Sequence, residues 1–485
     1  MNKNSLAEFI YAKHISWRFA CASSSHDDRT KMAKFVSSHF LFVLAIISTV
    51  NGFEPKANIE DQTTLRLVQL IHSHGDRTPG QFVHNDPYSL VRHFWPEGIG
   101  QLTRLGRNRM YKVGRFFHGV YANFLNTYRY QTNVENFIQV RSSSYRRCLE
   151  SASALSAGLI GGLSNFEREN DNFTAEEFIY ENLERFWIPI PIKSFSPKGT
   201  DPLLDVDFPC PNLDKIFHEI KHQDHRIKQV EQENRQFLKE ISFYAGEKID
   251  SLKSINFLYQ ELYIETQANY HWYKFPYQIW TQNYESYAIQ RLRELSQIYW
   301  TLFYDNFSIQ RLIGGELIRE INNNFRNFVN GSNRETKFYL YSTHDGKIVS
   351  ILQAFGIYNT FLISPGATLV FELHENQSTE NTNSNDLYGN YFLKFYYFNE
   401  TFSDNGACEV FPEKFCHNHR QICPLNHYME KVFEYEPADI RYECGVDIHH
   451  LGTKVNLSLM ITNGILLVIF ILLLNIFACI NYTIK

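Results

Sequence analysis

The stretch Ile71-His72-Ser73-His74-Gly75-Asp76-Arg77-Thr78-Pro79 carries most of what the sequence says about the fold. It completes an aliphatic run, Leu65–Ile71, whose density of leucine, valine and isoleucine predicts a buried β-strand. The polar residues after that strand would place the imidazole of His74 and the guanidinium of Arg77 at one edge of a sheet. Gly75 would let a ligand approach the backbone closely, because glycine has no side chain in the way.

Two further runs have the same character and the same kind of ending. Phe137–Val140 is followed by Arg141 and three serines, and Phe338–Tyr341 is followed by Ser342-Thr343-His344-Asp345. An Ala- and Leu-rich segment, Ser151–Leu163, comes after the first of these and predicts a helix. Alternation of strand, polar loop and helix is typical of an α/β fold whose site lies at the carboxyl ends of the strands.

The middle of the chain has a different character. Between about Trp187 and Tyr304, strand-like runs are scarce and helical patterns dominate, as in Asp214–Ile220, Ile227–Tyr244 and Ala288–Leu302. Further strands are expected at Thr368–Leu373 and Tyr391–Phe398. We therefore predict an α/β domain formed by residues 53–186 and 305–450, with a helical cap inserted at residues 187–304.

Composition excludes several classes of protein. The chain has 485 residues, 44% of them hydrophobic, which is enough for one or two substantial cores. Its 47 Lys and Arg residues nearly balance 52 Asp and Glu residues, and no long basic run occurs, which argues against a nucleic-acid partner. No HExxH, CxxC or acidic cluster indicates a metal site, so we expect neither a metal nor another cofactor.

Both ends of the chain carry apolar segments that indicate the secretory pathway. In residues 32–52, Lys34 precedes the apolar run Phe40–Val50, which is typical of a signal peptide and too short to span a bilayer. Residues 1–31 form an upstream leader of doubtful status. At the other end, the 22 uncharged residues Leu459–Ile480 would span about 33 Å as a helix.

These segments predict a single-pass type I membrane protein with a lumenal or extracellular domain. The transmembrane helix would occupy residues 459–480 and a short cytoplasmic tail residues 481–485; a lipid-anchor signal is the competing interpretation. N-x-S/T sequons support the orientation, since they recur through the predicted lumenal part at Asn172, Asn306, Asn330, Asn376, Asn399 and Asn456. We expect glycans at the first five of these.

Taken together, the motifs resemble those of a known family, the histidine acid phosphatases. This is the branch of the phosphoglycerate mutase-like superfamily that includes prostatic and lysosomal acid phosphatases and phytases. The segment around His74 is similar to the family signature, and further blocks match in order at Trp95–Thr103 (WPEGIGQLT), Val140–Ala152 and Tyr341–Asp345. The resemblance runs from about Leu65 to Cys444 and implies a mixed α/β sheet flanked by helices, with a smaller helical cap domain.

The resemblance also implies roles for the matching residues. His74 would attack phosphorus and form a phosphohistidine, and Asp345 would protonate the leaving alcohol and then activate water. The phosphoryl group would be bound by three cations, Arg77, Arg147 and His344. Of the adjacent pair Arg146 and Arg147, the spacing to Ser151 selects Arg147 for the pocket. The substrate would be a small phosphate monoester; homodimers, common among relatives, are left open by the sequence.

Position 73 departs from the family pattern. The family has arginine immediately before the nucleophilic histidine, where this chain has Ser73. A hydroxyl would give phosphate one neutral hydrogen bond in place of two charged ones, and losing one such donor typically lowers rates on the order of 10²–10³-fold. Arg146 or Lys347 could supply a substitute cation. We therefore predict a membrane-anchored acid phosphatase of reduced activity; the alternative is a catalytically impaired pseudophosphatase that acts as a binding glycoprotein.

The family's disulfides are only partly matched. The resemblance implies the bonds Cys210–Cys444 and Cys416–Cys423, whereas both halves of a third bond are missing. Cys148 and Cys408 are left over. A free buried thiol is expected for Cys148, and Cys408 could compete with Cys416 for Cys423.

Overall fold

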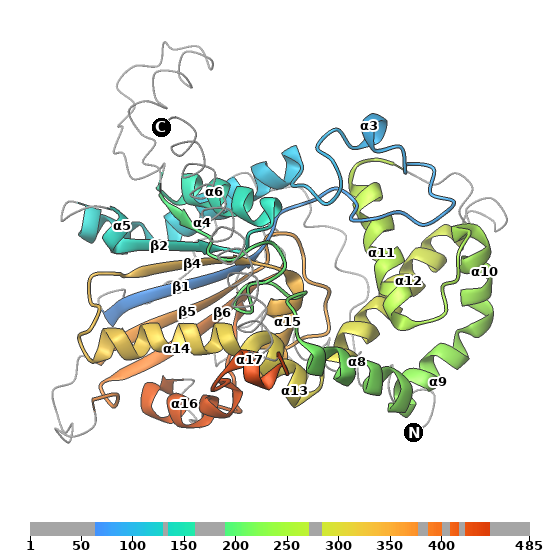
Figure 1. Cartoon of the computed structure of the whole chain (residues 1–485). Coiled ribbons are helices and arrows are strands. Elements are labelled where there is room, and N and C mark those ends of the chain that lie inside the picture. The colour runs from blue at the N-terminus through green and yellow to red at the C-terminus, as the bar shows by residue number, and fades with distance from the viewer. Residues whose placement is uncertain are drawn as a thin grey trace, which may run out of the picture.

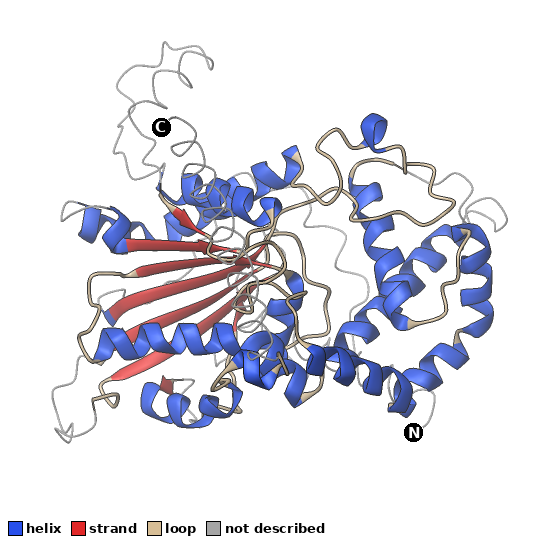
Figure 2. Cartoon of the chain, in the orientation of Figure 1, coloured by secondary structure: helices blue, strands red, loops and turns tan. Residues whose placement is uncertain are grey.

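The computed structural model describes residues 64–129, 134–160, 190–270, 284–376, 387–399, 408–416 and 422–446. They form a mixed sheet with helices on both faces and a group of helices to one side (Figures 1 and 2). The predicted leader, signal peptide, transmembrane segment and tail, and the sequons at Asn172 and Asn456, lie outside these ranges. Within the described part, no helix combines the length and the hydropathy that a bilayer crossing requires.

The sheet is built around the three strands expected to lead into the site. Among the described residues its order is β3-β2-β4-β1-β5-β6-β7, with β8 also paired to β6. The pairs β1–β4, β4–β2 and β2–β3 are parallel, and β5 and β6 run antiparallel to their neighbours. The strands are β1 Leu65–Ser73, β2 Ile138–Ser142, β3 Ile192–Lys193, β4 Phe338–Thr343, β5 Thr368–Glu375, β6 Tyr391–Phe398, β7 Cys408–Glu409 and β8 Cys423–Pro424. The mixed α/β fold is confirmed, and the carboxyl ends of β1, β2 and β4 lie side by side.

Side chains alternate between two cores on the two faces of the sheet. On β1, Val68 and Leu70 pack with helices α4 and α6, whereas Leu67 and Ile71 pack with α14, α15 and α16 on the other face. Figure 1 shows α4 and α6 above the sheet and α14 and α16 below it. The bounds are α3 Val91–Phe94, α4 Arg104–Arg129, α5 Val134–Phe137, α6 Arg146–Ile160, α14 Gly315–Val329, α15 Asp345–Ala354, α16 Leu425–Val432, η3 Phe433–Tyr435 and α17 Ile440–Glu443.

A group of helices stands beside the sheet, where a cap was expected (Figure 1). It comprises α8 Pro211–Gln223, α9 His225–Glu233, α10 Arg235–Ala245, α11 Leu252–Gln267 and α12 Tyr284–Tyr304, which is followed by α13 Phe307–Ile309 and the π-helical turn η2 Gln310–Gly314. The helix predicted over Ile227–Tyr244 is interrupted at Asn234, whose side chain donates to the Val230 carbonyl and accepts from Arg291. The strand β3 also falls inside the predicted cap range but belongs to the sheet.

Two disulfides join the segments that the family resemblance pairs. Cys210 at the start of α8 is bonded to Cys444, and Cys416 is bonded to Cys423. Because Cys423 is taken by Cys416, the competing pairing with Cys408 does not form. Cys148 is a free, buried thiol on α6, as expected.

Candidate active site

His74 follows the last residue of β1 and faces a cavity at the carboxyl edge of the sheet. Its Nδ1 lies 2.9 Å from the carbonyl oxygen of Gly75, to which it donates, so Nε2 keeps a free lone pair. Burial and the nearby cations Arg147, His344 and Arg77 hold the pKa of His74 well below its usual range. These surroundings favour the neutral ring, which is the form that can act as a nucleophile. His72, two residues earlier, is fully buried, and burial lowers its pKa to about 4, which is consistent with a structural role.

Gly75 serves helix packing as well as ligand access. A Cβ atom at this position would lie 2.7 Å from the carbonyl oxygen of Gly106 in α4, which is closer than real Cβ atoms come. Its backbone N–H donates to the hydroxyl of Ser151, which in turn donates to the carbonyl of Arg147. The loop that carries the nucleophile is thus fixed against both α4 and α6. Gly75 also lines the cavity, so the close approach of a ligand stays a prediction.

The WPEGIGQLT block forms backbone hydrogen bonds with the residues that follow His74. Thr78 donates through its backbone N–H to the carbonyl of Gln101 and through its hydroxyl to the carbonyl of Gly98. Position 77 forms an isolated antiparallel bridge with Leu102. Asp76 lines the cavity, and its carboxylate accepts two hydrogen bonds from Arg109, at 2.6 and 3.1 Å.

The ends of β2 and β4 bring in two more cations. Arg147 in the first turn of α6 places Nη2 3.2 Å from Nδ1 of His344, the residue that follows β4. Its neighbour Arg146 points to solvent, where it pairs with Glu150. Of the two, Arg147, the one selected by the spacing to Ser151, is the residue that contacts His344. The rings of His74 and His344 lie 5.8 Å apart, centroid to centroid.

His344 is surrounded by groups that favour its charged form. The hydroxyl of Ser143 lies 3.2 Å from Nε2 and donates to Asp205 at 2.6 Å, and the Asp205 carboxylate itself lies 3.9 Å from Nε2. Burial alone would lower the pKa of His344, but the sulfur of Cys148 and the Asp205 carboxylate raise it to about 9. Two cationic groups in contact, Arg147 and His344, form a site that an anion would stabilise.

The residues behind this cation pair were not found from the sequence. Tyr145 stacks its ring 4.5 Å under the Arg147 guanidinium and edge-on to His344, and its hydroxyl contacts Asp207. Asp205 and Asp207 belong to the loop before α8, which matches no family motif. The only signal in the sequence is that they lie a few residues before Cys210. That position does not indicate whether their side chains point toward the site.

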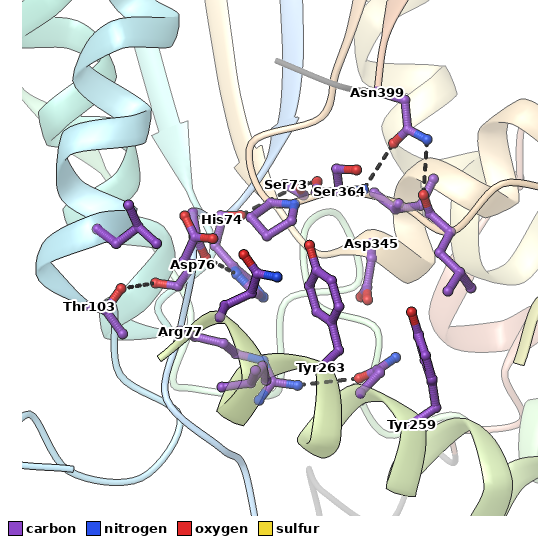
Figure 3. A pocket seen from close by; sticks show the side chains of 18 of the residues that line it. Ser73, His74, Asp76, Arg77, Thr103, Tyr259, Tyr263, Asp345, Ser364 and Asn399 are labelled. Atoms are coloured by element: carbon purple, nitrogen blue, oxygen red, sulfur yellow. Dashed lines mark hydrogen bonds between the residues drawn. The ribbon is translucent and has the colours of Figure 1, made fainter. Parts of the chain in front are cut away.

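Asp345 and Arg77 line the cavity, whereas Arg147 and His344 lie beside His74 but are not among the residues that line it. Figure 3 shows His74, Arg77 and Asp345 among the side chains that line the cavity. Asp345 begins α15, where its Oδ1 accepts from the backbone N–H of Gly346. The cavity encloses about 310 Å³, and much of its remaining wall is aromatic or aliphatic, including Trp95, Tyr259, Tyr263, Trp300, Phe361, Leu362 and Ile363. The geometry thus brings together His74, Arg77, Arg147, His344 and Asp345 from three strand ends.

Ser73 also lines the cavity, but its hydroxyl is bonded elsewhere. It donates to the carbonyl of Ser364 at 3.2 Å, and that loop is held in turn by Asn399, which accepts from Ser364 N–H and donates to the Leu362 carbonyl. Lys347 supplies no substitute cation, because its buried ammonium donates to the carbonyls of Pro202 and Ile313. With Arg146 paired at the surface, the substitution hypothesis is wrong for both residues.

A strand-end histidine of low basicity set among cations is the arrangement expected of a histidine phosphatase. The chain belongs to the histidine phosphatase superfamily (branch 2), whose sequence pattern matches residues 64–397. It is 28% identical to lysosomal acid phosphatase of Bos taurus over 417 residues, which cover 85% of this chain and 88% of that protein. It is 28% identical to prostatic acid phosphatase of Bos taurus over 394 residues, covering 80% and 90% of the two chains. The chain is therefore a phosphomonoesterase of the acid phosphatase type.

Solved structures support the fold. The apo form of Hafnia alvei phytase superposes with a TM-score of 0.55 at 15% identity, covering 79% of this chain and 98% of that one. A phytase from Klebsiella sp. ASR1 gives 0.52 at 15% identity, with 78% and 98% covered. At such identities the likeness concerns the arrangement of the sheet and its helices.

Proposed function

We propose that the protein hydrolyses small phosphate monoesters through a phosphohistidine on His74. The observation that carries this proposal is the neutral imidazole with a free Nε2 among three cations and one carboxylic acid. Nε2 attacks phosphorus while Asp345 gives its proton to the departing alcohol oxygen. Asp345 then takes a proton from water, the water attacks the phosphohistidine, and inorganic phosphate and the free imidazole are regenerated.

The cations lower the barrier at the phosphoryl group. In the transition state, charge is spread over three phosphoryl oxygens, and fixed cations that need no reorganisation stabilise it most. Arg77 would serve one side of the group, and Arg147 with His344 the other. Ser73 offers one hydroxyl, which is already bonded to Ser364. We therefore propose an activity below that of a site with arginine at position 73.

The finer features of location are proposed from the sequence. We propose a signal peptide at residues 32–52, a membrane anchor at residues 459–480 and a lumenal or extracellular catalytic part. Asn330 and Asn376 are exposed and suited to carry glycans, and Asn306 is half-buried at the start of α13. We do not propose a glycan at Asn399, because its amide nitrogen donates to the Leu362 carbonyl, 2.9 Å away at the cavity wall.

The test compares His74→Ala with His84→Ala in the full-length protein, assayed with an aryl phosphate from about pH 4 to about pH 8. His84 is an exposed histidine outside the cavity, so its substitution controls for loss of a histidine as such. We expect His74→Ala to lower kcat on the order of 10⁴-fold or more and His84→Ala to keep full activity. Rapid quenching in alkali should trap phosphate on the wild-type protein and not on His74→Ala. A folded wild-type protein without turnover at any pH would favour the pseudophosphatase.

A further inference from the structure

Two helices beside the sheet line the cavity, α11 and α12, and α11 places two side chains on Arg77. Gln260 Oε1 accepts from Arg77 Nη2 at 3.3 Å, and Glu261 Oε1 lies 3.6 Å from Arg77 Nη1. The other carboxylate oxygen of Glu261 accepts from the backbone N–H of Gly80 at 3.1 Å. Glu261 thus joins the phosphate-binding guanidinium to the loop that follows it.

Glu261 is placed to compete with substrate. Its side chain is 5% exposed, so its charge is poorly screened, while Arg77 is 18% exposed and reaches the cavity. A phosphoryl dianion bound to Arg77 would bring its negative charge near the Glu261 carboxylate. Two anions that share one cation in a buried site repel each other, and this repulsion falls when the carboxylate takes up a proton.

The charged groups around Glu261 are few. Arg77 and Asp86 both face it from the loop between β1 and α3. Asp86 is in turn hydrogen-bonded to Glu265, one turn further along α11. Burial raises the pKa of Glu261 to about 7, against the lowering effect of Arg77. The carboxyl group is therefore neutral in acid and becomes charged as the pH passes neutrality.

We propose that Glu261 is a positioning residue that sets how much of the charge on Arg77 is available to the phosphoryl group. In acid, Glu261 is protonated and Arg77 is left to the substrate. Toward alkaline pH, the Glu261 carboxylate neutralises Arg77 and repels the incoming dianion, so anion affinity falls. This inference rests on the proposed function, because it assumes that Arg77 binds the phosphoryl group.

The experiment measures sulfate as a competitive inhibitor of the full-length protein from about pH 5 to about pH 8. Sulfate is chosen because it stays a dianion across this range, whereas phosphate changes its own charge. For the wild type we expect the inhibition constant to rise about tenfold over the range. For Glu261→Gln, which keeps the size and the acceptor oxygen, we expect a constant near the low-pH wild-type value throughout.

Two further variants sharpen the result. Glu265→Gln lies on the same helix and is equally buried but contacts Asp86, so it should keep the wild-type slope. Gln260→Ala removes the acceptor of Arg77 Nη2 without removing a titrating group, so it should weaken sulfate binding at every pH and leave the slope unchanged. A wild-type slope in Glu261→Gln would overturn the inference and leave the phosphatase function standing. Failure of sulfate and phosphate to inhibit at any pH would instead count against the proposed function.

Discussion

The anion site has two sides that hold their cations by different means. The sheet side consists of Arg147 and His344, backed by Tyr145 and Asp205. The cap side carries Arg77, backed by Gln260 and Glu261 of α11, and Arg293 of α12 also lines the cavity there. Behind the sheet side, Asp205 is fully buried and bonded to Ser143 and to the backbone of Asp201, whereas the cap side faces the open cavity.

The two sides differ in the pH range over which their positive charge is available to an anion. On the sheet side the pKa of His344 is raised to about 9, so its charge is present across the acid and neutral range. On the cap side the pKa of Glu261 is about 7, so the charge that Arg77 offers to an anion changes with pH. One proposed phosphate site thus combines a cation pair, Arg147 and His344, that stays charged with a single cation, Arg77, whose available charge changes with pH.

The largest expected effect comes from removing one arginine on each side. Arg147→Ala should lower kcat/KM on the order of 10²–10³-fold at every pH, because its partner His344 stays charged throughout. Arg77→Ala should show a similar loss near pH 5 and a clearly smaller one near pH 8, on the order of tenfold, where Glu261 already neutralises Arg77. The ratio of wild-type to variant kcat/KM across pH checks this, with the exposed Arg146→Ala as the matched control. Equal pH dependence of the two ratios would contradict the two-sided description.

A smaller effect, a gain in rate, is expected from adding a cation at position 73. Ser73→Arg should raise kcat on the order of tenfold, because a guanidinium at the end of β1 would face the cavity that Ser73 now lines. Ser73→Ala removes only the hydrogen bond to the Ser364 carbonyl and should change kcat less than about twofold. Steady-state kinetics of both variants, with thermal unfolding to confirm folding, decide the matter. If Ser73→Arg folds and gains nothing, the missing cation does not limit the rate.

Much of the fold could be predicted because its signals are local. Short apolar runs in the sequence predict β1, β2 and β4, and each strand ends within two or three residues of its predicted end. The residues that carry the chemistry follow these strands directly, so sequence order was enough to place His74, Arg147 and the His344-Asp345 pair at one edge. The break at Asn234 was missed because the side-chain bonds that end the helix come partly from Arg291, far along the chain.

The groups that tune the site could not be predicted for the same reason. Asp205 and Glu261 lie in segments without a motif, and each acts on a residue far away in the sequence. A buried carboxylate is recognisable only when the fold shows what covers it and which cation it meets. The position of Ser73 was predicted, but the partner of its hydroxyl, the Ser364 carbonyl, was not.

The smallest expected effect tests the sheet side through Asp205. Asp205→Asn keeps an oxygen that can accept from Ser143 but removes the negative charge beside His344, so the pKa of His344 should fall from about 9. A lower pKa means that His344 loses its charge at a lower pH, and under the proposed function this would weaken binding of the phosphoryl group. We expect kcat/KM to be unchanged near pH 5 and to fall about fivefold to tenfold near pH 8. The pH profile, with the His344 ring signal followed by NMR, measures both quantities. Asp207→Asn, which loses the contact with Tyr145 instead, should leave the His344 titration in place. An unchanged titration in Asp205→Asn would show that Cys148, and not the carboxylate, maintains the charge of His344.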